Sequence, residues 1–192
     1  MKRYRTRSAS RIVAGLISLI LILAGLGLIG YSLLIRDPFA AALFLGPDAP
    51  GNPTMTLTVP EMARVDEVPV YDAPPPGKAA LHDGALHLRG TGFPWQSGAN
   101  VYIAGHRLGF PATRSYLVFW DLDELGNGDE VILTDANGTQ YTYAVFKKLI
   151  VNPDAHYVTQ PVAGRSIVSL QTCTLPDYSQ RLVVQAELTS VS

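Results

Sequence analysis

One uncharged run in the sequence, from Ile12 to Ile35, is long enough to cross a lipid bilayer. At about 1.5 Å per helical residue, its 24 residues span roughly 36 Å, which exceeds the roughly 30 Å hydrocarbon core of a membrane. The alternative is a cleaved signal peptide, because the small residues at 40–42 resemble a cleavage site. Signal peptides usually have a shorter apolar stretch of about 7 to 15 residues, so we predict an uncleaved transmembrane helix over residues 12–35.

Basic residues precede this run: Lys2, Arg3, Arg5, Arg7 and Arg11. A charge bias of this kind keeps the N-terminal side of a membrane helix in the cytoplasm. We therefore expect a single-pass protein of the cell membrane with a cytoplasmic basic tail at residues 1–11. A linker at residues 36–53 and an extracellular domain at residues 54–192 would follow the helix.

The expected extracellular part is acidic. Five of the 15 Lys and Arg residues lie in residues 1–11, which leaves ten against 16 Asp and Glu, a formal net charge of about −6. Nucleic-acid binding needs a basic surface, so this composition argues against it. Because the chain has a single cysteine, Cys173, it cannot form an internal disulfide, and the domain must be stabilised by its core alone.

Short strands separated by turns make up most of this domain. MTLTV at residues 55–59 alternates apolar and polar side chains, as half-buried strands do. The other expected strands are Glu67–Tyr71, Ala85–Leu88, Asn100–Ala104, Glu130–Thr134, Gln140–Val151, Ser166–Thr172 and Gln180–Leu188. Asn137-Gly138 predicts a hairpin, and only Phe119–Leu125 favours a short helix. Eight strands with little helix predict an all-β, closed or partly closed barrel.

Two strand ends carry side chains suited to catalysis. The strand NVYIA leads through Gly105 to His106, and the strand IVSLQT leads to Cys173. Arg181 follows the cysteine by eight positions, so it can return to the same end of the next strand. A thiolate is a nucleophile, an imidazole supplies a proton to a leaving amine, and a guanidinium stabilises an oxyanion. Each residue alone also has an ordinary alternative: a buried thiol, a rim histidine or a surface arginine.

These segments resemble the sortases, the membrane-anchored cysteine transpeptidases of Gram-positive bacteria. SLQTC at Ser169–Cys173 is similar to their Thr-Leu-x-Thr-Cys motif, and Arg181 matches the arginine that opens the following strand. IAGHR at Ile103–Arg107 resembles the histidine motif, LDELGNGDEVIL the stretch between the two, and LTVPEM the first strand. The resemblance covers roughly residues 54–188 and implies the eight-stranded sortase-type β-barrel.

The resemblance also implies the reaction of a thiol protease of the hydrolase class that acts as a transpeptidase. Cys173 would attack the carbonyl after the threonine of a Leu-Pro/Ala-x-Thr-Gly-like sorting signal, and His106 would protonate the leaving amine. Arg181 would orient the substrate and stabilise the oxyanion. The resulting thioester would pass a surface protein to an amine acceptor, a peptidoglycan precursor of the cell wall or a pilin. Arg107 and the short turn at 174–180 favour the class E sortases of actinobacteria.

Three more residues are candidates for substrate binding. Tyr102 and Ala104 alternate along the strand that leads to His106, and in a regular strand they share its face. Thr172 precedes the cysteine, and its hydroxyl either donates to the substrate or serves a structural hydrogen bond.

No cofactor or metal is expected. Some sortases bind calcium before the cysteine strand, but NPDAHYVTQPVAG offers only Asp154, and Ca²⁺ takes six to eight oxygen ligands. His82, His87 and His156 have no partners at metal-ligand spacing, so we expect them at the surface or in loops.

Two other hypotheses stay open at this point. An L,D-transpeptidase also uses cysteine and histidine, but its Ser-His-Gly-Cys signature is absent from the sequence. The alternative from another class is a noncatalytic, membrane-tethered β-barrel that binds partners and has kept the sortase fold. The presence of all three catalytic residue types argues against it.

Overall fold

A computed structural model of the chain describes residues 15, 17–25, 50–73 and 80–192. The chain divides into two units, Met1–Ala49 and Pro50–Ser192, and all strands described lie in the second. In the first unit, residues 17–25 are helical. No helix within the described ranges has the length and hydropathy that crossing a membrane requires. The predicted tail at 1–11, and most of the predicted membrane helix and linker, lie outside the described residues.

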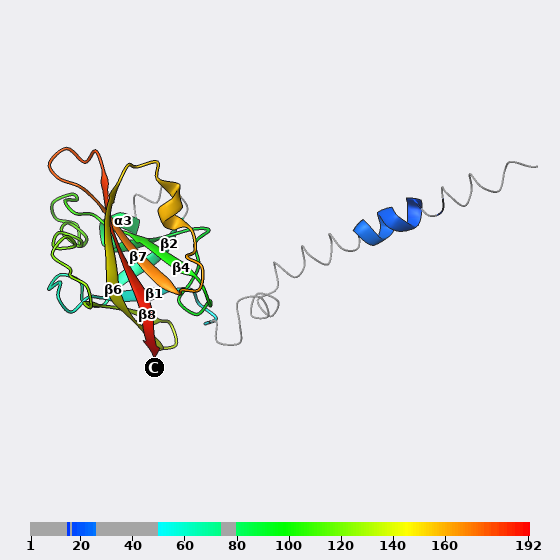
Figure 1. Cartoon of the computed structure of the whole chain (residues 1–192), viewed down its shortest axis with the longest axis horizontal. Coiled ribbons are helices and arrows are strands. Elements are labelled where there is room, and N and C mark those ends of the chain that lie inside the picture. Colours follow the sequence, from blue (N-terminus) through cyan, green and yellow to red (C-terminus); the bar gives the residue numbers. More distant parts are fainter. Residues whose placement is uncertain (1–14, 16, 26–49, 74–79) are drawn as a thin grey trace, which may run out of the picture. The chain divides into compact units, whose positions relative to one another are not determined.

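Eight strands close into a barrel within Pro50–Ser192 (Figure 1). They are β1 Met55–Thr58, β2 Val68–Ala73, β3 Ala85–Leu88, β4 Asn100–Ala104, β5 Glu130–Asp135, β6 Gln140–Val151, β7 Ile167–Cys173 and β8 Arg181–Val191. Their order around the barrel is β1-β2-β3-β4-β7-β8-β6-β5, and β5 pairs back with β1. The β2–β3 and β4–β7 pairs are parallel, and the other pairs are antiparallel. The predicted eight-stranded barrel is confirmed.

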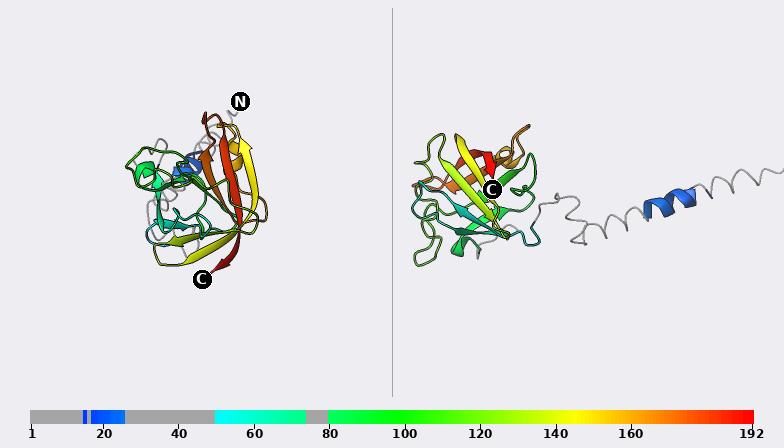
Figure 2. Two further views of the ribbon diagram at one scale, coloured as in Figure 1. Left: turned by 90° about the vertical axis from the view of Figure 1, so that its left-hand side faces the viewer. Right: turned by 90° about the horizontal axis from the view of Figure 1, so that it is seen from below.

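The predicted hairpin at Asn137-Gly138 joins β5 to β6, which pair as antiparallel neighbours. Gly138 has a φ of 88°, a conformation that side chains disfavour and glycine adopts freely. Strand β6 continues beyond this hairpin and pairs with β8, so β6, β8 and β7 lie side by side (Figure 2).

Helices are few in the described part of the domain: α3 (Ala80–Asp83) and the 3-10 helix η1 (His156–Thr159) are single turns. The helix predicted at Phe119–Leu125 is wrong, because these residues form consecutive turns. The backbone N–H of Phe119 donates to the carbonyl of His106 at 2.9 Å, and the Phe119 side chain is fully buried. Tertiary contacts therefore override the helical pattern.

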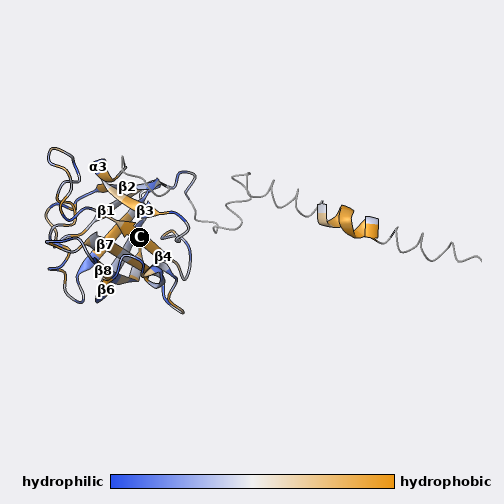
Figure 3. Ribbon diagram, turned by 90° about the horizontal axis from the view of Figure 1, so that it is seen from above, coloured by the Kyte–Doolittle hydropathy of each residue, from blue (hydrophilic) through white to orange (hydrophobic). Residues whose placement is uncertain are grey.

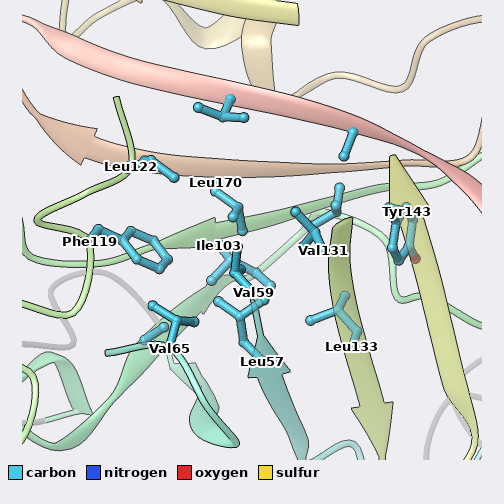
Figure 4. Close-up of a cluster of buried hydrophobic side chains, with 14 of the residues drawn as sticks. Leu57, Val59, Val65, Ile103, Phe119, Leu122, Val131, Leu133, Tyr143 and Leu170 are labelled. Carbon is cyan, nitrogen blue, oxygen red and sulfur yellow. The ribbon is translucent and has the colours of Figure 1, made fainter. Parts of the chain in front are cut away.

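The interior of the barrel is filled by one face of each strand. Val101 and Ile103 of β4 and Val168 and Leu170 of β7 belong to this core, and none is more than 1% exposed. Figure 4 shows Ile103, Leu170 and Phe119 reaching the same cluster, and Figure 3 shows hydrophobic residues (orange) on the strands. Burying a side chain of this size stabilises a fold by about 1.5–3 kcal/mol. Packing against this core therefore fixes the register of the neighbouring strands β4 and β7 relative to each other.

Candidate active site

The ends of β4 and β7 are tied together by hydrogen bonds just before the predicted catalytic residues. The N–H of Gly105 donates to the carbonyl of Gln171 at 3.0 Å, and the hydroxyl of Thr172 donates to the carbonyl of Gly105 at 2.8 Å. His106 directly follows Gly105, and Cys173 directly follows Thr172. Because β4 and β7 are parallel, both residues lie at the same end of the pair.

Strand β8 brings Arg181 to this end as well. Arg181 is the register partner of Cys173 across the antiparallel β7–β8 pair. Its Nη1 donates to the carbonyls of Tyr178 and Gln180, each at 3.0 Å, in the turn that joins the two strands. A guanidinium has five N–H donors, so the other nitrogens remain to meet a substrate carbonyl.

Cys173 and His106 are both partly exposed and differ in their surroundings. Cys173 is a free, partly exposed cysteine. His106 is half-buried, and its Nε2 is covered without a hydrogen-bond partner among the described residues. Burial lowers the pKa of His106, and the charge of His82 lowers it further. An imidazole whose pKa is lowered can take a proton from one reacting group and return it to another.

Two glycines let the His106 segment pack closely against aromatic rings. A Cβ on Gly105 would lie 2.6 Å from Cδ2 of Phe119, and a Cβ on Gly109 would lie 3.0 Å from Cγ of His106. The first contact is closer than carbon atoms tolerate, and the second would require the His106 ring to shift by a few tenths of an ångström. The contact between Gly105 and Phe119 depends on the tertiary fold, because 14 positions separate the two residues in the sequence.

A pocket of about 200 Å³ lies on the outer face of β4 and β7. Tyr102, Gln171 and Arg181 line it from the strands, and residues of the β6–β7 connection that includes η1 line the other side. The hydroxyl of Tyr102 donates to Oε1 of Gln171 at 3.1 Å. Burial raises the pKa of Tyr102 to about 12, and the charge of Arg181 acts in the opposite direction. The phenol therefore stays neutral and keeps its proton for hydrogen bonding.

A buried polar chain fixes the β6–β7 connection against the barrel. Nδ2 of Asn100 donates to the carbonyls of Val158 and Gln160, both at 2.9 Å. The hydroxyl of Ser169 donates to Oδ1 of Asn100 at 2.8 Å, and Nε2 of Gln185 donates to Oγ of Ser169 at 3.2 Å. The three side chains are at most 6% exposed. Since an unpaired buried polar group costs about 1–3 kcal/mol, this chain holds the pocket wall in one position.

The residues predicted to bind substrate occupy different surroundings. Tyr102 lines the pocket, and Ala104 is partly exposed two residues further along β4. Thr172 is fully buried, and its hydroxyl proton is engaged by Gly105, which supports the structural alternative for this residue. Its hydrogen bond ties the two strand ends together.

The expectation for His87 is wrong, because its side chain is 0% exposed. Its Nδ1 lies 3.2 Å from Oδ1 of Asp72, and its Nε2 lies 3.0 Å from the carbonyl of Gly92. These acceptors allow a polar ring inside the barrel, a feature that spacing along the chain did not reveal. His82 and His156 are exposed, as expected. In the described ranges, no three His, Cys, Asp or Glu side chains gather in a group suited to a metal ion.

A closed mixed β-barrel whose adjoining strand ends carry a thiol, an imidazole and a guanidinium defines a class of cysteine-dependent barrel enzymes. Residues 57–189 match the family model described as the Sortase domain. The chain belongs to the sortase family, a family of cysteine transpeptidases of the cell surface. The resemblance inferred from the motifs is confirmed.

Individual sortases are similar to the chain in sequence and fold. Sortase A of Streptococcus agalactiae serotype III (strain NEM316) is 34% identical over 89 residues, which make up 46% of this chain and 36% of that protein. The match therefore spans about a third of the length of this relative. Sortase A from Corynebacterium diphtheriae superposes with a TM-score of 0.63 at 24% identity, over 73% of this chain and 62% of that chain, which shows the fold.

Two sortases C have similar scores. Sortase C-1 from Actinomyces oris gives a TM-score of 0.62 at 26% identity and covers 72% of this chain and 76% of that chain. Sortase C2 of Group B Streptococcus Pilus Island 1 gives 0.61 at 26% identity, over 71% of this chain and 73% of that chain.

Proposed function

We propose that this chain is a membrane-anchored sortase that cleaves a Leu-Pro/Ala-x-Thr-Gly-like sorting signal and joins the acyl part to an amine. Cys173 is the nucleophile, His106 the acid and base, and Arg181 the group that binds the substrate carbonyls. The observation that carries the proposal is the pairing of three strand ends. Cys173 and Arg181 are register partners across β7 and β8. Gly105, which directly precedes His106, is hydrogen-bonded to Gln171 and Thr172, the two residues before Cys173.

In the first half of the reaction, the sulfur of Cys173 attacks the carbonyl carbon of the signal's threonine, and the thiol proton passes to the imidazole of His106. A C–S bond forms, and the negative charge that develops on the oxygen is stabilised by the guanidinium of Arg181. The C–N bond then breaks, and His106 gives its proton to the departing glycine amine. A thioester between the signal peptide and Cys173 remains.

In the second half, an acceptor amine attacks the thioester and Cys173 leaves as a thiolate. The proposed acceptor is a cell-wall precursor or a pilin, and the proposed acyl donors are surface proteins that carry the sorting signal. The second of the sortases C described above is named for a pilus island, which supports a pilin as one candidate. The short turn at 174–180, closed by a bond from the Thr174 N–H to the Gln180 carbonyl at 3.0 Å, supports the class E assignment.

Membrane anchoring is part of the proposal. The large apolar side chains of residues 17–23 in the described helix are more than half exposed, for example Leu21 at 66%. Apolar side chains exposed on a helix need an apolar environment, and the bilayer provides one. With the basic residues of 1–11 in the cytoplasm, the catalytic domain would face the cell exterior.

The test uses the unit Pro50–Ser192, which contains the whole barrel and its core. Incubated with a peptide that carries Leu-Ala-x-Thr-Gly or Leu-Pro-x-Thr-Gly, it should gain the mass of the acyl fragment, and hydroxylamine should release that mass. The Cys173→Ala variant should gain nothing. If the unsubstituted protein binds the peptides without ever forming the adduct, the noncatalytic barrel is the better description.

A further inference from the structure

Phe110 is a large aromatic residue that is exposed close to the predicted general acid. Its side chain is 59% exposed. One of its neighbours is the ring of His106, at 6.3 Å between centroids and 89° between planes. Another is the ring of His82, at 5.0 Å and 73°. Ligand sites are lined mainly by apolar and aromatic side chains, so an exposed ring beside His106 is a candidate to contact a bound group.

The loop that carries Phe110 is held in place by the short helix α3. The hydroxyl of Ser115 donates to the carbonyl of Leu81, and the N–H of Ser115 approaches the carbonyl of His82 at 3.5 Å. The hydroxyl of Thr113 donates to the carbonyl of Phe110 itself at 2.7 Å. The ring is therefore presented on a fixed backbone, as a binding surface requires.

The topology places Phe110 and Cys173 on different flanks of His106. Strand β4 has two neighbours, β3 and β7. Cys173 ends β7. On the other side, α3 directly precedes β3. Because Leu86 near the start of β3 pairs with Ala104 at the end of β4, α3 lies beyond the end of β4. The pocket of Tyr102 and Gln171 lies further back along the outer face and suits the acyl part of the substrate. The β3 flank of His106 is thus left for the group on the nitrogen side of the bond.

The acid–base role of His106 dictates where the acceptor must approach. The incoming amine takes the place of the departing amine, because the same imidazole exchanges a proton with both. An amine that exchanges a proton with the His106 ring places the carbon chain behind it next to the Phe110 ring. Aliphatic stems bury well along aromatic surface, whereas a glycine amine has no such stem.

We propose that Phe110, held between His82 and His106, forms the acceptor subsite and selects a primary amine on an aliphatic side chain, as in lysine or a diamino acid. This inference rests on the proposed function. In the step concerned, the amine lone pair attacks the thioester carbonyl, a C–N bond forms and the C–S bond breaks. The amine proton passes to the imidazole of His106 and from there to the thiolate of Cys173.

The experiment separates acceptor binding from acyl-enzyme formation in the full chain. Sorting-signal peptide is mixed with enzyme, and the thioester is resolved by Nα-acetyl-lysine amide, glycine amide or hydroxylamine, with products measured by mass spectrometry. Phe110→Ala should lower kcat/KM for the lysine amide about tenfold. Transfer to hydroxylamine, which is too small to cover the ring, and the rate of thioester formation should change less than about twofold. Phe110→Leu, which keeps apolar surface, should recover part of the loss.

Trp120→Ala is the matched control. Trp120 is an aromatic residue that is 38% exposed and lies, like Phe110, in the connection between β4 and β5. We assign it no part in the reaction. It should leave the preference for the lysine amide unchanged. Equal losses with all three nucleophiles, an equal loss in Trp120→Ala, or no loss in Phe110→Ala would each overturn the inference. If the unsubstituted enzyme forms no thioester, the proposed function itself fails, and the inference fails with it.

Discussion

The inner and outer faces of β4 and β7 are both largely buried, yet their side chains serve different purposes. On the inner face, Ile103 and Leu170 contact an apolar core and make no directional interactions. On the outer face, Asn100 and Tyr102 are equally buried but hydrogen-bonded to partners on other segments. Apolar packing gives the strands their stability, and the polar bonds fix the pocket wall and the strand ends. Substitutions on the two faces should therefore affect stability and activity in different proportions.

The largest effect on stability is expected on the inner face. Leu170→Ala removes a side chain that is 1% exposed and should lower the free energy of unfolding by about 2–5 kcal/mol. Its neighbour Gln171 is partly exposed on the outer face and accepts a hydrogen bond from the Tyr102 hydroxyl, so Gln171→Ala should lower the free energy of unfolding by only about 1 kcal/mol. Urea unfolding followed by tryptophan fluorescence measures both. Equal losses at the two positions would contradict the division between the faces.

A smaller effect is expected where the outer face holds the β6–β7 connection. Asn100→Ala removes two donated hydrogen bonds and leaves Ser169 without its acceptor, which should cost about 1–3 kcal/mol. Because the pocket wall loses its tether, KM for the sorting peptide should rise more than kcat falls. Asn127→Ala, at an exposed asparagine, is the matched control and should change neither quantity. A variant at Asn100 that binds peptide normally would show that the tether is unrelated to the pocket.

The smallest effect is expected from the charge of His82, which lowers the pKa of His106. Because His82 contributes to lowering the pKa of His106, His82→Ala should raise that pKa, and the acid limb of the acylation rate should move to higher pH. Burial is the larger cause, so the pKa should stay below its ordinary value of about 6.5. NMR titration of the His106 ring measures it. A downward movement would contradict the assignment of the cause.

The same lowered pKa has a consequence for stability. The folded chain binds a proton at His106 less readily than the unfolded chain does. The contribution of His106 to the free energy of unfolding is therefore fully present above about pH 6.5. It declines as the pH falls from there to the lower pKa of the folded state.

Local patterns were sufficient to predict the strands, and contacts between distant segments were not predictable from them. The short apolar run that ends at Ala104 identified β4 with its observed bounds, because a strand buried on both faces has a continuous apolar sequence. The helix expected at Phe119 failed because its N–H bonds to His106, which the local pattern does not contain. His87 was misplaced for the same reason, since Asp72 and Gly92 satisfy it inside the barrel.

The candidate site shows the same limit. Motif resemblance led to Cys173, His106 and Arg181, and the ladder of β4, β7 and β8 puts them at adjoining strand ends. Asn100 carried a usable signal, a polar residue opening an otherwise apolar strand. Phe110 carried none, because its position beside His106 depends on how α3 and its own loop pack together.

The central claim is that three strand ends on the barrel form one catalytic centre. It is tested most directly by the rate of thioester formation in His106→Ala and Arg181→Ala, measured beside their unfolding temperatures. We expect each variant to acylate at least about 100-fold more slowly, with an unfolding temperature within about 4 °C of the unsubstituted protein. Variants that acylate at the unsubstituted rate, or that lose activity only because they unfold, would contradict the account.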